Sequence, residues 1–105
     1  MTSKFLDIPS KELVKGVTGK YFHAETFTVG YVTIEAGATM PLHSHIHEQT
    51  THVVSGKLEM TVDGKSSILE KGSIICIPSN AIHGAKALTC CEVIDTFCPI
   101  REDYK

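Results

Sequence analysis

Short segments rich in β-branched and aromatic residues recur along this chain, and turn residues separate them. The segments cover residues 27–34, 50–55, 57–62, 65–69, 73–77 and about 89–97. Between two of them, Asp63-Gly64 is a strong signal for a two-residue hairpin turn. Only residues 10–15 (SKELVK) suggest a helix, of one or two turns. This pattern predicts an all-β fold, either a sandwich or a barrel.

The length and charge of the chain limit the classes of protein to consider. A chain of 105 residues suits one domain, residues 1–105. The net charge of −2, without a run of like charges, argues against binding to nucleic acid or to an anionic membrane surface. No apolar run approaches the roughly 20 residues that span a bilayer, and the N-terminal residues lack the apolar stretch of a secretory signal. We therefore expect a cytoplasmic protein.

The four cysteines, Cys76, Cys90, Cys91 and Cys98, show no paired C-x-x-C spacing, which argues against a structural zinc site. All four lie in apolar, strand-like stretches. We interpret them as reduced thiols in the core, with a reactive thiol as the alternative.

Four of the six histidines fall within residues 37–56. Residues two apart on a strand share a face, so His43 and His45 are expected to point into one cavity. Neutral imidazoles are common ligands of transition metals. The spacing alone leaves other interpretations open: structural or surface histidines, or a surface cluster that binds metal adventitiously.

The wider spacing around these histidines resembles the first motif of the cupin superfamily. Gly37 is followed by five residues and then by His43-Ser44-His45; Gln49 comes after three more residues and Gly56 after six. Gln49 stands where the family usually has Glu. An amide is a neutral, weaker ligand and cannot serve as a general base.

A second stretch resembles the second cupin motif. Gly72 is followed after five residues by Pro78, and two residues separate Asn80 from His83. Asn80 replaces the usual glycine, and Asn tolerates the left-handed backbone that a turn glycine supplies. Ala87 replaces the usual Asn at the end of the motif.

The two motifs together imply a jelly-roll β-barrel, also called a double-stranded β-helix, with one divalent metal near one mouth. The implied ligands are His43, His45, Gln49 and His83. The implied ion is Ni, Mn, Zn or Fe, and ligand affinity does not distinguish among them. His47 shares the strand parity of His45 and is a candidate for the pocket wall, whereas His52 has the opposite parity.

The end of the chain contains Asp95-x-Phe97-x3-Arg101. Together with residues 43–49, it resembles the small cupins of pectin and uronate breakdown. The resemblance implies an enzyme that converts a cyclic unsaturated uronate to its linear keto form. In this interpretation Arg101 binds the substrate carboxylate, Asp95 moves a proton and Phe97 forms an apolar wall for the sugar.

Other interpretations of the same residues remain. Asp95 and Arg101 could form a surface ion pair, and Phe97 could belong to the core. The protein could instead be a metal-dependent dioxygenase, or a sugar- or metal-binding module without catalysis. Cupins of this size commonly form homodimers, and an expected N-terminal strand over residues 5–8 is a candidate pairing element.

Overall fold

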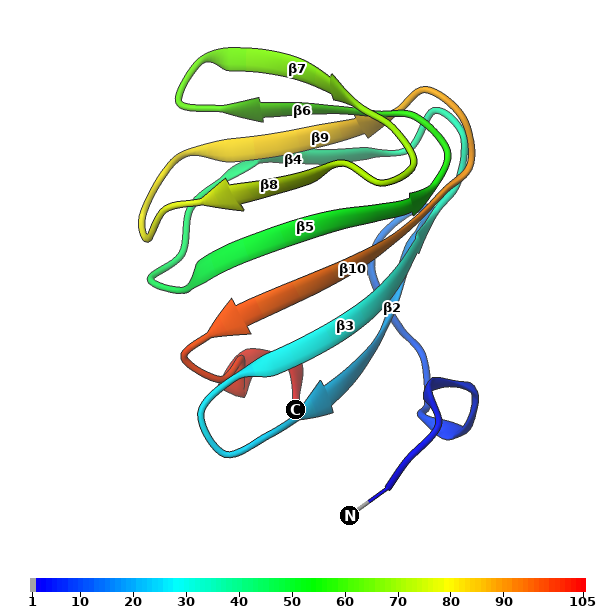
Figure 1. Ribbon diagram of the computed structural model, residues 1–105, viewed down its shortest axis with the longest axis vertical. Coiled ribbons are helices and arrows are strands. Elements are labelled where there is room, and N and C mark those ends of the chain that lie inside the picture. Colours follow the sequence, from blue (N-terminus) through cyan, green and yellow to red (C-terminus); the bar gives the residue numbers. More distant parts are fainter. Residues whose placement is uncertain (1) are drawn as a thin grey trace.

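The computed structural model describes residues 2–105, and its strands form two antiparallel sheets (Figure 1). In order across the six-stranded sheet lie β1 (Lys11–Val14), β2 (Val17–His23), β3 (Thr28–Ile34), β10 (Cys91–Cys98), β5 (Glu48–Ser55) and β8 (Ile74–Ile77). The four-stranded sheet consists of β4 (Thr39–His43), β9 (His83–Ala87), β6 (Leu58–Val62) and β7 (Lys65–Leu69). Two short 3₁₀ helices, η1 (Phe5–Asp7) and η2 (Glu102–Tyr104), lie near the ends of the chain.

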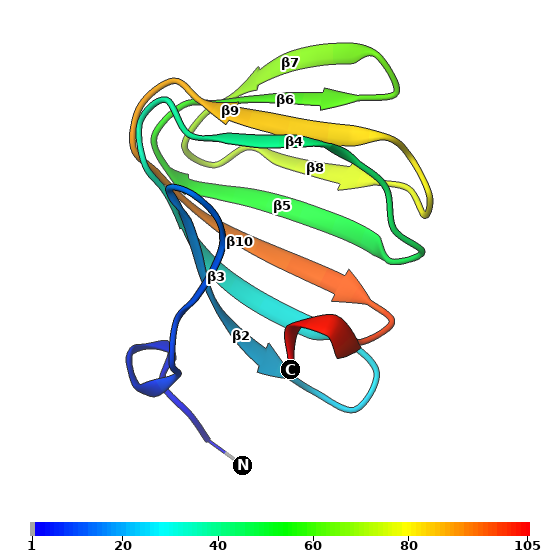
Figure 2. The ribbon, with the colours of Figure 1, turned by 180° about the vertical axis from the view of Figure 1, so that it is seen from behind.

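The two sheets face one another (Figures 1 and 2). Alternate residues of strands such as β3 and β5 are buried between them. Val53, Leu58, Ile77 and Val93 are almost completely buried there. The all-β prediction is therefore confirmed. Within the described residues, each sheet keeps its own hydrogen-bonding network, so the sheets do not close into a continuous barrel.

Two turns behave as their sequences predict. Asp63 and Gly64 both have positive φ and connect β6 to β7, with Val62 paired to Lys65. Asn80 has a φ of 66°, the left-handed conformation that a glycine would otherwise supply. This turn places the next residues at the start of β9, where His83 lies.

The N-terminal predictions were wrong. Residues 11–14 form strand β1, and the short helix η1 lies earlier, where a strand over residues 5–8 was expected. Strand β1 forms because it pairs with β2 at the sheet edge, with Lys11 opposite Gly19. Tertiary pairing thus overrides a weak helical pattern. Phe5 of η1 packs against Tyr31, with the ring centroids 5.8 Å apart.

The prediction that all four cysteines belong to the core was also wrong. Cys91 is buried, but Cys76, Cys90 and Cys98 are exposed. Cys76 and Cys98 lie on strands that keep one face towards solvent, and Cys90 precedes β10. An apolar run alone does not reveal which face is exposed. All four cysteines are free. Within the described residues, no helix is long and apolar enough to cross a membrane.

Candidate functional site

Three histidines converge between the two sheets at one end of the molecule. His43 ends β4, and its register partner His83 begins β9. His45 lies in the loop before β5. The expectation that the two histidines of the H-x-H motif share one strand was therefore wrong. They nevertheless meet, and one ligand atom from each of His43, His45 and His83 lies within 4.8 Å of the others. This cluster could hold a metal ion.

The backbone orients all three imidazole rings in the same way. The Nδ1 atoms of His43, His45 and His83 donate to the carbonyl oxygens of Pro41, His47 and Ala81, at 2.7, 3.0 and 2.9 Å. A carbonyl oxygen only accepts, so each Nδ1 carries a proton, and in the neutral imidazole the Nε2 atom then keeps its lone pair. Such backbone contacts typically orient histidines that bind metals. Nε2 of His83 is buried without a hydrogen-bond partner.

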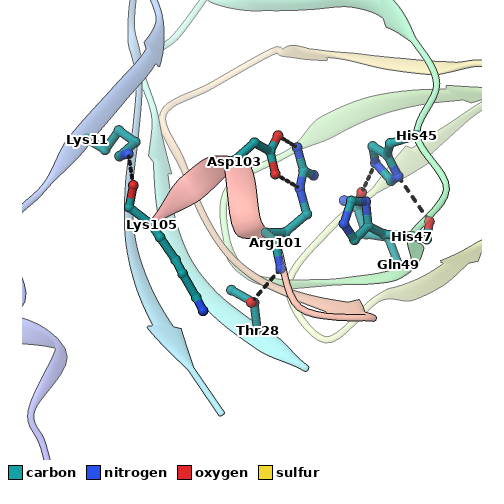
Figure 3. Close-up of polar contacts among 8 residues, drawn as sticks. All are labelled: Lys11, Thr28, His45, His47, Gln49, Arg101, Asp103 and Lys105. Atoms are coloured by element: carbon teal, nitrogen blue, oxygen red, sulfur yellow. Dashed lines mark hydrogen bonds and ion pairs between the residues drawn. The ribbon is translucent and has the colours of Figure 1, made fainter. Parts of the chain in front are cut away.

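Gln49, the second residue of β5, brings a fourth lone pair to the cluster. Its Oε1 lies 3.1 Å from Nε2 of His45 (Figure 3). Burial, followed by the charge of Arg101, lowers the pKa of His45 to about 4. His45 is therefore neutral at pH 7, and its single proton is on Nδ1. Two acceptors thus face each other at 3.1 Å, an arrangement that a cation stabilises.

The distance between these acceptors fits a shared ion. Two ligands that each lie about 2.1 Å from one metal, at right angles, are about 3.0 Å apart. The lone pairs of the three histidines and of Gln49 are thus a suitable ligand set for a divalent metal. An amide and three imidazoles carry no charge, so this set does not neutralise the ion.

A hydrogen-bond relay fixes the orientation of Gln49. Nε2 of Gln49 donates to Oγ1 of Thr51 at 3.0 Å, and Thr51 donates to Oδ1 of Asp95 at 2.7 Å. Because the Asp95 carboxylate only accepts, the Thr51 hydroxyl proton points to it. The Thr51 oxygen then accepts from the amide of Gln49, which turns Oε1 towards His45. Thr51 and Gln49 therefore link Asp95 to His45.

Asp95 lies on the inner face of β10, directly across from Thr51 on β5. It keeps some accessible surface because it borders a cavity, but protein surrounds the carboxyl group. This burial raises its pKa from 3.8 to about 6, although the hydrogen bonds from Thr51 and Gln49 and the charge of Arg101 oppose the rise. A carboxyl group with such a pKa can exchange protons near neutral pH.

Arg101 follows β10 and turns back into the molecule, with 6% of its surface exposed. Its backbone N–H donates to Oγ1 of Thr28 at 2.9 Å, and its guanidinium group pairs with Asp103 (Figure 3). The surface ion pair between Asp95 and Arg101, weighed as an alternative, is not formed. The pairing partner is instead a residue that the sequence patterns did not single out.

One cavity of about 60 Å³ connects these groups. Two predicted ligand histidines, His43 and His83, border it together with three residues of the C-terminal pattern, Asp95, Phe97 and Arg101. Gln49, Thr51, Tyr21, Tyr104 and a set of apolar side chains complete its walls. Residues of the histidine cluster and of the Asp95–Arg101 pattern therefore border the same cavity.

Tyr21 is a cavity residue that the sequence did not indicate. Its ring lies over Gly19 and Gly30, where any added Cβ would come within 2.6 Å of it. Its hydroxyl is buried without a hydrogen-bond partner, and burial raises the pKa of the phenol far above its usual value. The phenol is thus a permanent donor inside the cavity. Neighbouring Gly and Tyr residues on strands carry no recognisable signal for such an arrangement.

The remaining histidines lie beside the site or away from it. His47 packs against His45 and Phe97, at centroid distances of 5.3 and 6.4 Å, and its Nδ1 is buried without a partner. His52 is exposed on the opposite face of β5, as its strand parity predicts.

Comparisons with known proteins agree with this architecture. The family model of the cupin domain matches residues 30–97. The pectin degradation protein KdgF of Dickeya dadantii (strain 3937) is 32% identical over 109 residues, covering 99% of each chain.

Solved structures show the same arrangement of strands. KdgF from a Halomonas species has a TM-score of 0.87 and 30% identity, over 92% of this chain and 93% of that one. An RmlC-like cupin from Shewanella frigidimarina NCIMB 400 has a TM-score of 0.92 and 28% identity, over 98% and 94% of the two chains. A salicylate 1,2-dioxygenase from Pseudoaminobacter salicylatoxidans, at 16% identity, shares the fold alone.

Proposed function

Because the chain belongs to the cupin family, we propose that it is a metal-dependent enzyme that acts on a uronate-like sugar acid. Its reaction would be the conversion of an unsaturated cyclic uronate to the linear keto form. The observation that carries this proposal is the single cavity that His43, His83, Asp95 and Arg101 border together. The relatives named for pectin degradation support the choice of substrate class.

The reaction is an isomerisation, so protons that leave must return. The anomeric hydroxyl loses its proton, the ring C–O bond breaks, and the enolate that forms takes up a proton on carbon. One group that accepts a proton and then returns it satisfies this balance. Asp95 has a pKa near 6 and keeps Oδ2 for this exchange, since Oδ1 accepts from Thr51. Gln49, a neutral amide, cannot take this role.

Three other features would bind and orient the substrate. Arg101 offers the N–H groups that Asp103 does not use to the uronate carboxylate. Phe97 is 3% exposed and presents an apolar wall. His43, His45, Gln49 and His83 would hold one divalent ion, of Ni, Mn, Zn or Fe, which when bound supplies Lewis-acid polarisation of a substrate oxygen.

The size of the cavity places a condition on this mechanism. About 60 Å³ accommodates a few water molecules rather than a monosaccharide. The sugar acid would therefore bind across the mouth, or Tyr104 and the residues around it would move outward.

As further parts of the proposal we retain residues 1–105 as one domain, a homodimer and a cytoplasmic location. A monomer in light scattering at micromolar concentration would contradict the homodimer.

Arg101→Ala tests the proposed role of the carboxylate site. Turnover of unsaturated galacturonate should fall roughly 100-fold, because charge-assisted hydrogen bonds of about 1.5–3 kcal/mol are lost. The bound metal, measured by elemental analysis, should be unchanged. Lys86→Ala removes an exposed cation from β9 and serves as the control. If the metal-loaded wild type converts unsaturated galacturonate and mannuronate only at the background rate, the proposed function is wrong.

A further inference from the structure

Asp103 makes the strongest contact to Arg101, which is the only arginine in the chain. Its carboxylate accepts from Nε at 3.0 Å and from Nη2 at 2.8 Å, a bidentate pair. The two side chains differ in environment: 7% of the side-chain surface of Arg101 is exposed, compared with 59% for Asp103. The pair therefore joins a cavity residue to the protein surface.

Two aromatic rings restrict the same guanidinium group. Its central carbon lies 3.8 Å from the ring centroid of Tyr104 and 4.7 Å from that of Phe97. The two rings are perpendicular, at an interplanar angle of 89°. Rings and carboxylate together fix both the plane of the guanidinium group and its rotation within that plane. The rings alone would leave rotation within the plane free.

An inventory of N–H groups shows what Arg101 has left for a ligand. A guanidinium group has five N–H donors. Asp103 takes the one on Nε and one on Nη2. The remaining donors are the two on Nη1 and the second on Nη2. One donor from each of these nitrogens forms the Nη1–Nη2 edge, which Asp103 does not occupy. Because Arg101 borders the cavity, this edge is the one available to a carboxylate there.

We propose that Asp103 is a positioning residue, which holds Arg101 so that its Nη1–Nη2 edge faces the carboxylate of a bound sugar acid. The proposal rests on the function proposed above and adds to it. Asp103 then acts through Arg101 and does not touch the substrate. The opposite role would be competition, in which Asp103 occupies Arg101 until a substrate carboxylate displaces it.

A spectroscopic experiment tests the positioning without any substrate. Because the chain has one arginine, a ¹⁵N spectrum of the side-chain Nε–H contains a single signal. In the wild type this proton is hydrogen-bonded and should exchange slowly with water. In Asp103→Ala the signal should exchange at least tenfold faster, and in Asp103→Glu it should return towards the wild type. An unchanged signal in Asp103→Ala would overturn the proposal.

The matched control is Glu102→Gln. Glu102 is the neighbouring acid of η2, and its carboxylate pairs with Lys105 at 3.3 Å rather than with Arg101. The variant removes an acidic charge one residue away and should leave the Nε–H signal as it is. If it alters the signal as much as Asp103→Ala does, the net charge or the integrity of η2 controls Arg101, and the proposal fails.

Kinetics with unsaturated galacturonate separate positioning from competition. With metal occupancy unchanged, Asp103→Ala should lower kcat about tenfold and change KM less than threefold. Partial recovery of kcat in Asp103→Glu supports positioning. A lower KM with an unchanged kcat identifies Asp103 as a competitor and overturns the proposal. If the wild type itself shows no turnover, the proposed function fails, while the exchange experiment still decides whether Asp103 positions Arg101.

Discussion

Two parts of the site differ in how their polar atoms are partnered. We call them the histidine wall (His43, His45 and His83) and the C-terminal wall (Phe97, Arg101, Asp103 and Tyr104). On the histidine wall, the backbone fixes each Nδ1, while Nε2 of His83 has no partner and Nε2 of His45 faces another acceptor. On the C-terminal wall, the buried charge of Arg101 has both a carboxylate and aromatic rings around it. The histidine wall thus has polar atoms without a protein partner, to which a cation could bind, whereas Arg101 has its partners within the chain.

This difference indicates which interactions depend on conditions. Groups that lack a protein partner gain most from an added ion, so under the proposed metal site the stability of the histidine wall would depend on metal concentration. The C-terminal wall is already organised before any ligand binds, which lowers the entropic cost of binding there. Gln49, Thr51 and Asp95 connect the two walls. The following variants test the contrast from its strongest element to its weakest.

Loss of one ligand histidine should have the largest effect. His45→Ala should weaken metal binding about a thousandfold, because a binding free energy of ten or more kcal/mol is shared among four ligands. Metal titration by calorimetry measures the loss. His52→Ala, on the exposed face of β5, should bind like the wild type. Equal weakening in both variants would show that the metal binds elsewhere.

Asp95→Asn should change how stability depends on pH. Because its pKa rises from 3.8 to about 6 on folding, the native state binds more protons than the unfolded state between these pH values. Asp95 therefore lowers the free energy of unfolding as pH rises through this range, by about 3 kcal/mol when fully ionised. Urea unfolding of metal-free protein between pH 4 and 7 should show the Asn variant gaining stability relative to wild type as pH rises.

The difference between the two curves isolates Asp95, because His45 acts in the opposite direction. Its pKa is lowered to about 4, so its contribution to stability increases with pH over the same range. The wild type and the Asn variant share this contribution of His45, so it cancels in the difference. A difference that stays constant from pH 4 to 7 would show that Asp95 has an ordinary pKa.

Thr51→Val should have the smallest of the three effects. It keeps the shape of the side chain but removes the hydroxyl that links Gln49 to Asp95, at a cost of about 1–3 kcal/mol in stability. Metal affinity should fall roughly tenfold, as expected when an indirect contact to a ligand is lost. Thr51→Ser, which retains the hydroxyl, is the control. Unchanged affinity in the Val variant would mean that the two walls act independently.

The strands that were predicted and those that were missed differ in composition. The segments underlying β3, β5, β6, β8 and β10 have residues that favour strands on their own, and β7 follows from the Asp63-Gly64 hairpin turn. In contrast, β4 contains Pro41, which its edge position and the register irregularity beside it accommodate. Strand β9 (HGAKA) has little intrinsic preference for a strand. It forms because it pairs with β4 and β6, and such long-range pairing is not visible locally.

The residues of the site also fall into those that the sequence predicted and those that it did not. The motif spacing singled out His43, His45, Gln49 and His83, and the structure places them together. The roles of Thr51, Tyr21 and Asp103 depend on which strands are neighbours and how the chain turns after β10. Thr51, for example, meets Asp95 only because β5 pairs with β10 in this register. No pattern of residues along the chain encodes that contact.

The absence of side chains at Gly19 and Gly30 leaves room for the ring of Tyr21, which borders the cavity. These two glycines therefore affect the space available in the cavity. An alanine at Gly30 would place its methyl group 2.5 Å from the Tyr21 ring. The Tyr21 ring would then have to move, and Tyr104 restricts it, because the two ring centroids are 4.7 Å apart. A larger residue at Gly19 or Gly30 would thus displace Tyr21, which borders the cavity, without altering any proposed metal ligand or charged group. Glycines that contact no ligand can in this way limit the size of the ligand that the cavity accommodates.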